Sequence, residues 1–226
     1  KIIRFFKISY AKKVIIINSR AYDLLNKNKF IKNEKYIILL DEMFNNEQYL
    51  RLGTYTDKKI IKIHYENLIK KLKIISKYYK KKVIICIHPS DNLKEKKNIF
   101  SDFIVKQYQT KKYIYQSKLI LFFESSAIID AIILKKKIMT ILSNALDTNQ
   151  TANNMHYVNE IDIPFLNVDE DLTFDKDTIN KYKYDKKKIN KSYNSYINKY
   201  IAPDNSNIQG YVKISNIIKK NFFLRK

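Results

Sequence analysis

Two short polar segments of this chain carry side chains that could bind a phosphorylated ligand. In the first, Glu124, Ser125 and Ser126 separate the apolar runs Lys118–Phe123 and Ala127–Lys136. We predict a strand, a turn and a helix here, with both hydroxyls at the N-terminus of the helix. Unsatisfied N–H groups and the positive end of the helix dipole favour phosphate at such a position. A plain helix cap would use the same serines, and the two roles can coexist.

The second segment is His88-Pro89-Ser90, which directly follows the apolar run Val83–Ile87. The imidazole could donate a hydrogen bond to a phosphate or a nucleotide, and Pro89 would stiffen the turn that aims it. A histidine that only caps a neighbouring carbonyl is the alternative interpretation. The segment is therefore a second candidate for contact with the same ligand.

Four further residues extend this set. Glu124 could accept a ribose or sugar hydroxyl, or could act as a cap. Asp41 and Glu42 follow the run Tyr36–Leu40 and could supply a general base if a sugar hydroxyl were presented there. An acidic pair at a strand end is also common without a catalytic role. Thr110 could cap the helix that precedes the strand leading to the two serines.

The elements that position these residues are predicted strands alternating with helices. Short β-branched runs are typical of strands buried on both faces, and lysines opposite an apolar stripe at spacings of three and four predict a helix over Asp57–Lys80. This order predicts an α/β fold, a Rossmann-like parallel sheet with helices on both faces. Ligands of such sheets lie beyond the carboxyl ends of the strands, so the motifs should meet at one edge. The predicted strands are Val14–Ile17, Tyr36–Leu40, Val83–Ile87, Lys118–Phe123 and Ile138–Leu142.

Composition divides the chain into three parts. Residues 1–35 are interpreted as a remnant of an N-terminal domain or a linker, because the chain begins at Lys1 without an initiator Met. Residues 36–169 contain the predicted sheet. In residues 170–226, tyrosines alternate with Lys and Asn, which predicts one or two amphipathic helices that pack back on the sheet or on a missing domain.

The net charge of +22, from 44 Lys+Arg against 22 Asp+Glu, would ordinarily suggest nucleic acid. Asn, Ile, Lys and Tyr share A/T-rich codons, however, so genome base composition explains much of the excess and makes nucleic acid the weaker interpretation. Contact with an anionic membrane surface stays open. Cys86, the single cysteine, lies in an apolar run and suggests a buried thiol in a reducing compartment. We expect a cytoplasmic protein, with peripheral contact to the inner face of the plasma membrane as a further option.

Several other chemistries find no support in the sequence. Gly53 and Gly210 are the only glycines, so no glycine-rich nucleotide loop and no GxSxG motif can be built. The spacing of Cys and His residues does not match a metal site. We therefore predict neither a bound metal nor a cofactor.

Taken together, the motifs resemble the C-terminal half of GT-B glycosyltransferase-like proteins from bacterial capsule and lipopolysaccharide loci. The matching segments are Tyr36–Glu42, Tyr65–Leu68, Val83–Pro89, Ser117–Leu121 leading to Ser125-Ser126, and Lys135–Ile138. The His-Pro and Ser-Ser pairs are similar to the HP and SS/ST motifs of bacterial sialyltransferases and polysialyltransferases, and to parts of Kdo transferases. In those families HP contacts the nucleotide and the paired hydroxyls hold the donor phosphate.

The resemblance implies a nucleotide-sugar-binding domain at residues 36–169 and a metal-independent transfer of sugar, for example from a CMP-linked donor, to a glycan or lipid-linked acceptor. Lys137 stands where such enzymes usually have Pro, and the catalytic base of the sialyltransferase group lies in an N-terminal domain. A non-catalytic GT-B-like module, a CDP-glycerol-type glycerophosphotransferase and a nucleic-acid-binding protein stay open as alternatives.

Overall fold

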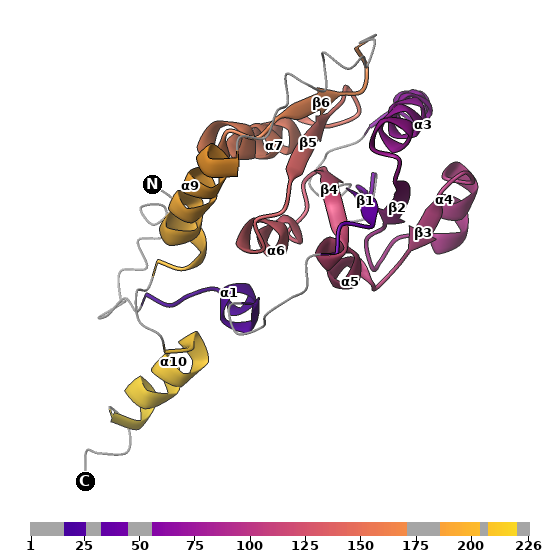
Figure 1. Cartoon of the computed structure of the whole chain (residues 1–226). Helices are drawn as coiled ribbons and strands as arrows, with labels where there is room; N and C mark the ends of the chain where they lie inside the picture. Colours follow the sequence, from indigo (N-terminus) through magenta and orange to yellow (C-terminus); the bar gives the residue numbers. More distant parts are fainter. Residues whose placement is uncertain (1–15, 26–32, 45–55, 171–185, 204–207, 221–226) are drawn as a thin grey trace.

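A single parallel sheet organises the part of the chain that the computed structural model describes, which is residues 16–25, 33–44, 56–170, 186–203 and 208–220 (Figure 1). Its six strands follow the order β3-β2-β1-β4-β5-β6. The strands are β1 (Tyr36–Leu40), β2 (Lys82–Cys86), β3 (Ile104–Lys106), β4 (Ser117–Phe122), β5 (Ile138–Leu142) and β6 (Phe165–Asn167). The predicted α/β, Rossmann-like parallel sheet is thereby confirmed.

The central strand β1 shows why the strands of this sheet are formed by apolar runs of sequence. Ile38 pairs with Ile84 of β2 on one side and with Ile120 of β4 on the other, so the strand has no exposed edge. Ile37 packs into one hydrophobic core and Ile38 into another, on opposite faces of the sheet. A strand flanked by two strands and covered on both faces has to be apolar at every position.

Helices cover both faces of the sheet. On one face, Tyr65, Leu68, Leu72 and Ile75 of α3 pack with the first core. On the other, α5, α6 and α9 contribute buried side chains to the second core, which also takes in the end of α7. The helices are α3 (Lys58–Tyr79), α4 (Leu93–Ile99), α5 (Thr110–Tyr115), α6 (Ile128–Ile133), α7 (Thr148–Ile161) and α9 (Lys186–Tyr196).

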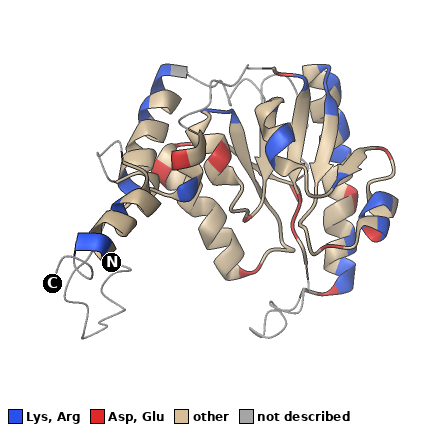
Figure 2. Ribbon diagram, turned by 90° about the horizontal axis from the view of Figure 1, so that it is seen from below, with Lys and Arg blue, Asp and Glu red and all other residues tan. Residues whose placement is uncertain are grey.

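The longest helix, α3, follows the predicted pattern closely. The Asp57 side chain accepts a hydrogen bond from the backbone N–H of Lys59 at 2.6 Å and so caps the N-terminus. Lys80, in the left-handed conformation at φ 50°, ends the helix. Lysines occupy its outer face, as they do on other outward-facing helices (Figure 2).

Two predicted elements differ from the structure. The predicted strand Val14–Ile17 is wrong where it can be compared, because Ile16 and Ile17 are irregular and Ile16 is 56% exposed; the first two residues lie outside the described ranges. The predicted helix Ala127–Lys136 is shorter, at Ile128–Ile133. Lys135 takes a left-handed φ of 51°, and the N–H of Lys136 turns back to the carbonyl of Ala131. The chain thereby leaves the helix before its lysines.

The C-terminal region continues the second core and then leaves it. Tyr193 of α9 is fully buried, and its hydroxyl donates to the carbonyl of Lys136 at 2.9 Å. A π-helical segment, η2 (Ile197–Ile201), follows α9, and α10 (Gly210–Ile218) extends away from the sheet (Figure 1). Tyr182 and Tyr184, part of the predicted tyrosine-rich helix, lie outside the described residues.

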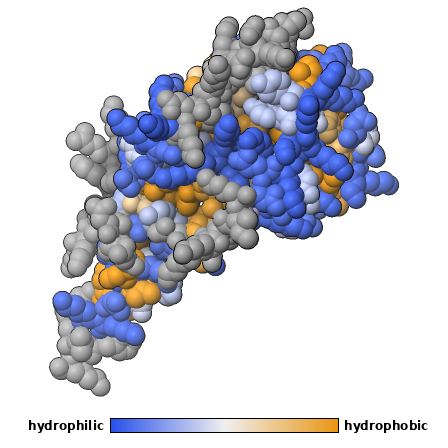
Figure 3. All heavy atoms as spheres, in the orientation of Figure 1, coloured by the Kyte–Doolittle hydropathy of each residue, from blue (hydrophilic) through white to orange (hydrophobic). Residues whose placement is uncertain are grey.

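Helix α10 contacts the start of the described chain. The N–H of Gly210 donates to Asp23 of α1 (Arg20–Leu25) at 2.8 Å, and a Cβ at Gly210 would lie 3.3 Å from the carbonyl oxygen of Asn18. Tyr211, Ile214 and Ile218 of α10 are exposed. Figure 3 shows an apolar patch on the surface in the region of this helix. Among the described helices, none combines the length and the apolar character needed to cross a bilayer.

Candidate functional site

A cavity of about 430 Å³ opens at the carboxyl ends of β1, β2 and β4. Strand order reverses between β1 and β4, because β1 is followed in sequence by β2 on one side and neighbours β4 on the other. In doubly wound sheets ligands bind at such a switch point. All the predicted site residues except Ser90 line the cavity: Asp41, Glu42, His88, Pro89, Thr110, Glu124, Ser125 and Ser126. The expected meeting of the motifs at one edge is what the structure contains.

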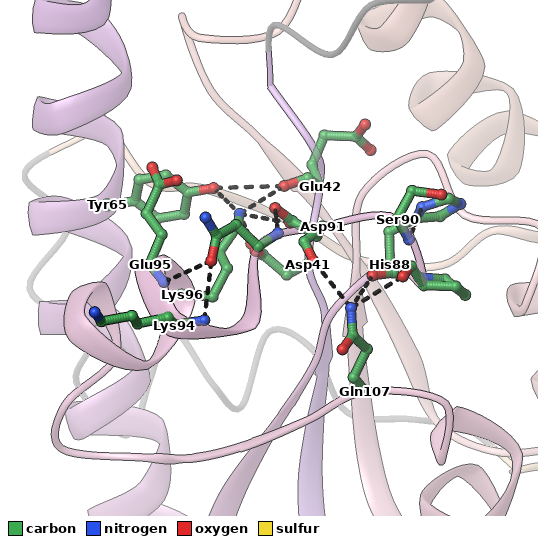
Figure 4. Close-up of polar contacts among 12 residues, drawn as sticks. Asp41, Glu42, Tyr65, His88, Ser90, Asp91, Lys94, Glu95, Lys96 and Gln107 are labelled. Carbon is green, nitrogen blue, oxygen red and sulfur yellow. Dashed lines mark hydrogen bonds and ion pairs between the residues drawn. The ribbon is translucent and has the colours of Figure 1, made fainter.

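The loop after β2 fixes the orientation of His88. Its Nδ1 accepts a hydrogen bond from the backbone N–H of Ser90 at 3.1 Å (Figure 4). In the neutral imidazole the proton therefore resides on Nε2, which is available as a donor. Ser90 thus acts on the site through its backbone, and the alternative in which His88 caps a carbonyl does not match this geometry.

Side chains of the loop after β3 form hydrogen bonds with the backbone of the loop that carries His88. The Gln107 amide donates to the carbonyls of Pro89 at 3.0 Å and Asp91 at 2.9 Å (Figure 4). The Tyr108 hydroxyl donates to the carbonyl of Pro89 at 2.9 Å. Tyr108 has a φ of 60°, a conformation that is uncommon for an aromatic residue. The carbonyls of the loop are therefore tied down while the imidazole stays exposed.

Ser125 and Ser126 form the turn between β4 and α6. Their carbonyls accept from Ile128 and Ile129 at 3.1 and 3.3 Å, whereas within the described chain neither hydroxyl and neither N–H of the two serines donates to another protein group. The N-cap of α6 is Ala127, which forms no side-chain cap. The interpretation of the serines as plain helix caps is therefore wrong, and their donors face the cavity region unused.

Thr110 and Cys86 form the floor beside β2. Thr110 is the first residue of α5 rather than its cap, because the N-cap position belongs to Gln109, which makes no side-chain cap bond. Burial raises the pKa of the Cys86 thiol to about 12, and a hydrogen bond with Thr110 opposes this only in part. The prediction of a buried thiol is confirmed by its 3% exposure.

The acidic groups of the cavity differ in their surroundings. Glu124 accepts a hydrogen bond from the Asn153 side chain of α7 at 2.5 Å. Glu42 is 5% exposed, and its backbone carbonyl accepts from Lys96 at 3.0 Å. The Asp41 side chain is fully buried and pairs with the Lys96 ammonium at 2.5 Å. Burial raises the pKa of Asp41, and Lys96 opposes that rise.

Lys96 is the residue of this region that the sequence motifs do not reveal. It lies on α4, 5% exposed, among Asp41, Asp91 and the Tyr65 hydroxyl (Figure 4). Burial alone would lower its pKa, but the neighbouring Asp41, Tyr65 and Asp91 outweigh that effect and raise it. The ammonium therefore stays charged at neutral pH. In a chain with 44 Lys+Arg, the sequence does not distinguish Lys96 from the other basic residues.

His64 of α3 is a buried histidine that lines neither the cavity at the switch point nor the one between α3 and α4. It is 1% exposed and packs edge-on against Phe44 and Tyr65, with Nδ1 2.8 Å from the Ser143 hydroxyl. Burial lowers its pKa to about 4. The sequence signal for the burial of His64 is its spacing of four residues from Leu68, which puts it on the buried stripe of the helix.

A larger cavity, of about 610 Å³, lies between α3 and α4. Apolar side chains of Phe44, Ile61, Ile69 and Ile99 form much of its wall, and none of the predicted site residues lines it. Lys96 and Asp91 face this cavity rather than the one at the switch point. The larger volume therefore belongs to the cavity between α3 and α4, whereas the predicted site residues line the smaller cavity at the switch point. We take the smaller cavity as the candidate site because of these residues.

Comparison with known proteins gives a distant likeness of fold. No known protein family and no curated protein sequence matches the chain. Among solved structures it is similar to UDP-GlcNAc 2-epimerase of Methanocaldococcus jannaschii in complex with UDP-GlcNAc and UDP, at 15% identity and a TM-score of 0.45, over 92% of this chain and 55% of the other. The wall teichoic acid polymerase TagF matches at 17% identity and a TM-score of 0.45, over 89% and 47%.

A third similar structure is S. aureus TarM in complex with fondaparinux, α-GlcNAc-glycerol and UDP, at 16% identity and a TM-score of 0.43, over 83% of this chain and 35% of that one. The chain thus spans about half, or less, of the length of these proteins. At such identities and scores the likeness concerns the general fold and assigns no role to any residue. The sialyltransferase-type interpretation of the HP and SS pairs stays a prediction.

Proposed function

We propose that this chain is the donor-binding half of a GT-B-type glycosyltransferase and that the 430 Å³ cavity takes the nucleotide and phosphate of an activated sugar. One observation carries the proposal. His88, Ser125 and Ser126 come from two separate loops and line one cavity at the switch point, with donors that no group within the described residues uses. This is the position at which doubly wound sheets bind nucleotides.

In the proposed complex the phosphates lie against the turn at Ser125 and Ser126, within reach of their N–H groups and hydroxyls and of His88 Nε2. Each hydrogen bond to a charged phosphate oxygen contributes about 1.5–3 kcal/mol. During transfer the bond between the sugar carbon and the phosphate oxygen breaks while the acceptor oxygen attacks that carbon. Donors that are already in place stabilise the charge that grows on the departing phosphate.

The attacking hydroxyl of the glycan or lipid-linked acceptor has to lose a proton, and Asp41 and Glu42 are the proposed bases. The environment of the two differs. The carboxylate of Asp41 is held by Lys96, which lowers its tendency to accept a proton. We therefore favour Glu42 for the proton transfer, with Asp41 as part of its support. The donor is a substrate, and neither a metal nor a cofactor enters the proposed reaction.

The test is ligand-observed NMR with CMP, CDP, UDP and GDP at moderate salt. His88→Ala and Ser125→Ala should each weaken binding of the selected nucleotide by roughly tenfold, because each removes one charge-assisted bond. His156→Ala on α7 and Ser101→Ala after α4 are matched controls, since both residues are exposed and neither lines the cavity. Equal binding by the site variants and the controls would refute the proposed site.

The same experiment separates the alternatives. Selective binding of CDP favours glycerophosphate transfer from a CDP-linked donor over sugar transfer. Nucleotide binding without any transfer, when acceptor glycan and a partner chain are supplied, favours a non-catalytic module. Absence of nucleotide binding together with steeply salt-dependent binding of DNA or RNA favours the nucleic-acid alternative.

A further inference from the structure

The Lys96 ammonium joins two walls of the proposed donor site without entering it. Its three N–H bonds have three acceptors: the Asp41 carboxylate at 2.5 Å, the Glu42 carbonyl at 3.0 Å and the Tyr65 hydroxyl (Figure 4). Its remaining close contact, the Asp91 carboxylate at 3.2 Å, is electrostatic, which agrees with the absence of a hydrogen bond to that oxygen within the described residues. All the donors of this lysine are therefore used.

These contacts connect segments that are far apart in sequence. Asp41 and Glu42 end β1, whereas Asp91 closes the turn after β2, where its N–H donates to the carbonyl of His88 at 3.0 Å. A second oxygen of Asp91 accepts from the N–H of Asn92, the N-cap of α4, at 2.8 Å. Lys96 thus holds the acidic wall of the cavity against the wall that carries the imidazole.

Stability alone is a poor explanation for a lysine in this place. Removing an ammonium and a carboxylate from water is costly, and apolar residues of similar volume often stabilise a core as well or better. Directional contacts to one carboxylate, one carbonyl and one hydroxyl instead specify a unique arrangement of the surrounding backbone.

We propose that Lys96 is a positioning residue for the donor site, which sets the separation between the carboxyl end of β1 and the His88 loop. The proposal rests on the proposed function for its effect on nucleotide binding, but its effect on the loop can be measured without ligand. Lys96 lines the neighbouring cavity and is not among the residues that line the proposed donor cavity. Lys96 therefore affects the donor site indirectly, through its contacts with Asp41, Glu42 and Asp91.

The test compares Asp41→Asn with the double variant Lys96→Met/Asp41→Asn. Both lack the Asp41 charge, so the double variant does not leave that carboxylate buried without its cation. The first readout is the His88 ring signal in a carbon-proton NMR spectrum of the unliganded protein, assigned with His88→Ala. The second is the affinity for the nucleotide selected above. Lys97→Met, an exposed neighbour on the same helix, is the control.

We expect the His88 signal to move on going from Asp41→Asn to the double variant, and not in Lys97→Met. We also expect the affinity to fall by roughly tenfold, because a displaced His88 would lose about one hydrogen bond to the phosphate. An unchanged His88 signal in a folded double variant would overturn the positioning role. If no nucleotide binds the parent protein, the proposed function fails, while the His88 signal still decides whether Lys96 orders the loop.

Discussion

Replacement of Lys96 by methionine should reveal how much of the fold depends on one buried charge. The change keeps the length of the side chain but removes the ammonium, which leaves the fully buried Asp41 carboxylate without its cation. Breaking a buried ion pair from one side costs about 3–5 kcal/mol. A protein of this length loses about 2–4 °C in Tm per kcal/mol, so the midpoint should fall by roughly 6–20 °C.

The pH dependence of this loss has a defined sign. Burial already raises the pKa of Asp41, and Lys96 opposes that rise, so the pKa climbs further in Lys96→Met. A carboxyl group whose folded pKa is raised contributes stability below its unfolded pKa, near 3.9, and that contribution is lost as pH rises through the folded value. The variant should therefore be most destabilised near pH 7, and the difference from the parent should shrink towards about pH 4.

Urea denaturation at both pH values measures the effect, with Lys97→Met as the control on the same helix. The exposed control should change stability by less than about 0.5 kcal/mol. Titrating groups that Lys96 does not influence are shared by parent and variant and cancel in the difference. His64 is an exception, because the Lys96 charge contributes to its lowered pKa. A loss in Lys96→Met no larger than that of the control, or one that is equal at both pH values, would refute the assignment of a buried, charge-bearing pair.

Two further predictions concern the buried titratable groups His64, which lies outside the switch-point cavity, and Cys86, which lines it. Burial lowers the pKa of His64 to about 4, so the unfolded chain binds a proton below about pH 6.5 that the folded chain refuses. On going from about pH 7 to pH 5, this difference in proton binding lowers the free energy of unfolding by roughly 2 kcal/mol. In an NMR titration the His64 ring signals should keep the shift of the neutral form down to about pH 5. A titration midpoint near 6.5 would contradict the prediction. Cys86, with a pKa raised to about 12, should resist alkylation at about pH 8 in the native protein and react on addition of denaturant, whereas rapid native labelling would exclude the buried thiol.

The sequence was sufficient for strands β1, β2, β4 and β5 of the sheet and for the meeting of the motifs. Strands such as Tyr36–Leu40 are apolar at every position because they are covered twice, and this pattern is visible without knowledge of any neighbour. Parallel strands also end at one edge, so residues that follow different strands must approach one another. Asp41, His88 and Ser125 line one cavity for that reason.

The elements that escaped prediction are short or depend on distant partners. Strands β3 and β6 have three residues each, too few for a period to be detected. Lys96 looks like any other lysine of the chain until Asp41, which is 55 positions away, is brought against it. The irregular backbone at Ile16 and Ile17 shows the converse, since an apolar run forms a strand only where a neighbouring strand accepts its hydrogen bonds.

The charges of the cavity wall constrain how a nucleotide sugar could lie in it. Among the described residues of that wall, the side chains include three carboxylates and no Lys or Arg. Lys96 pairs with Asp41, Asn153 donates to Glu124, and Glu42 adds a carboxylate beside Asp41 at the end of β1. A diphosphate is therefore best accommodated on the serine side of the cavity, close to His88, with hydroxyl groups of the sugar or the acceptor turned towards Glu42. The long-range field of a chain with net charge +22 would draw the anionic donor towards the protein, but salt screens that field beyond about 10 Å. Local donors, rather than the lysine surface, then determine the orientation of the bound donor.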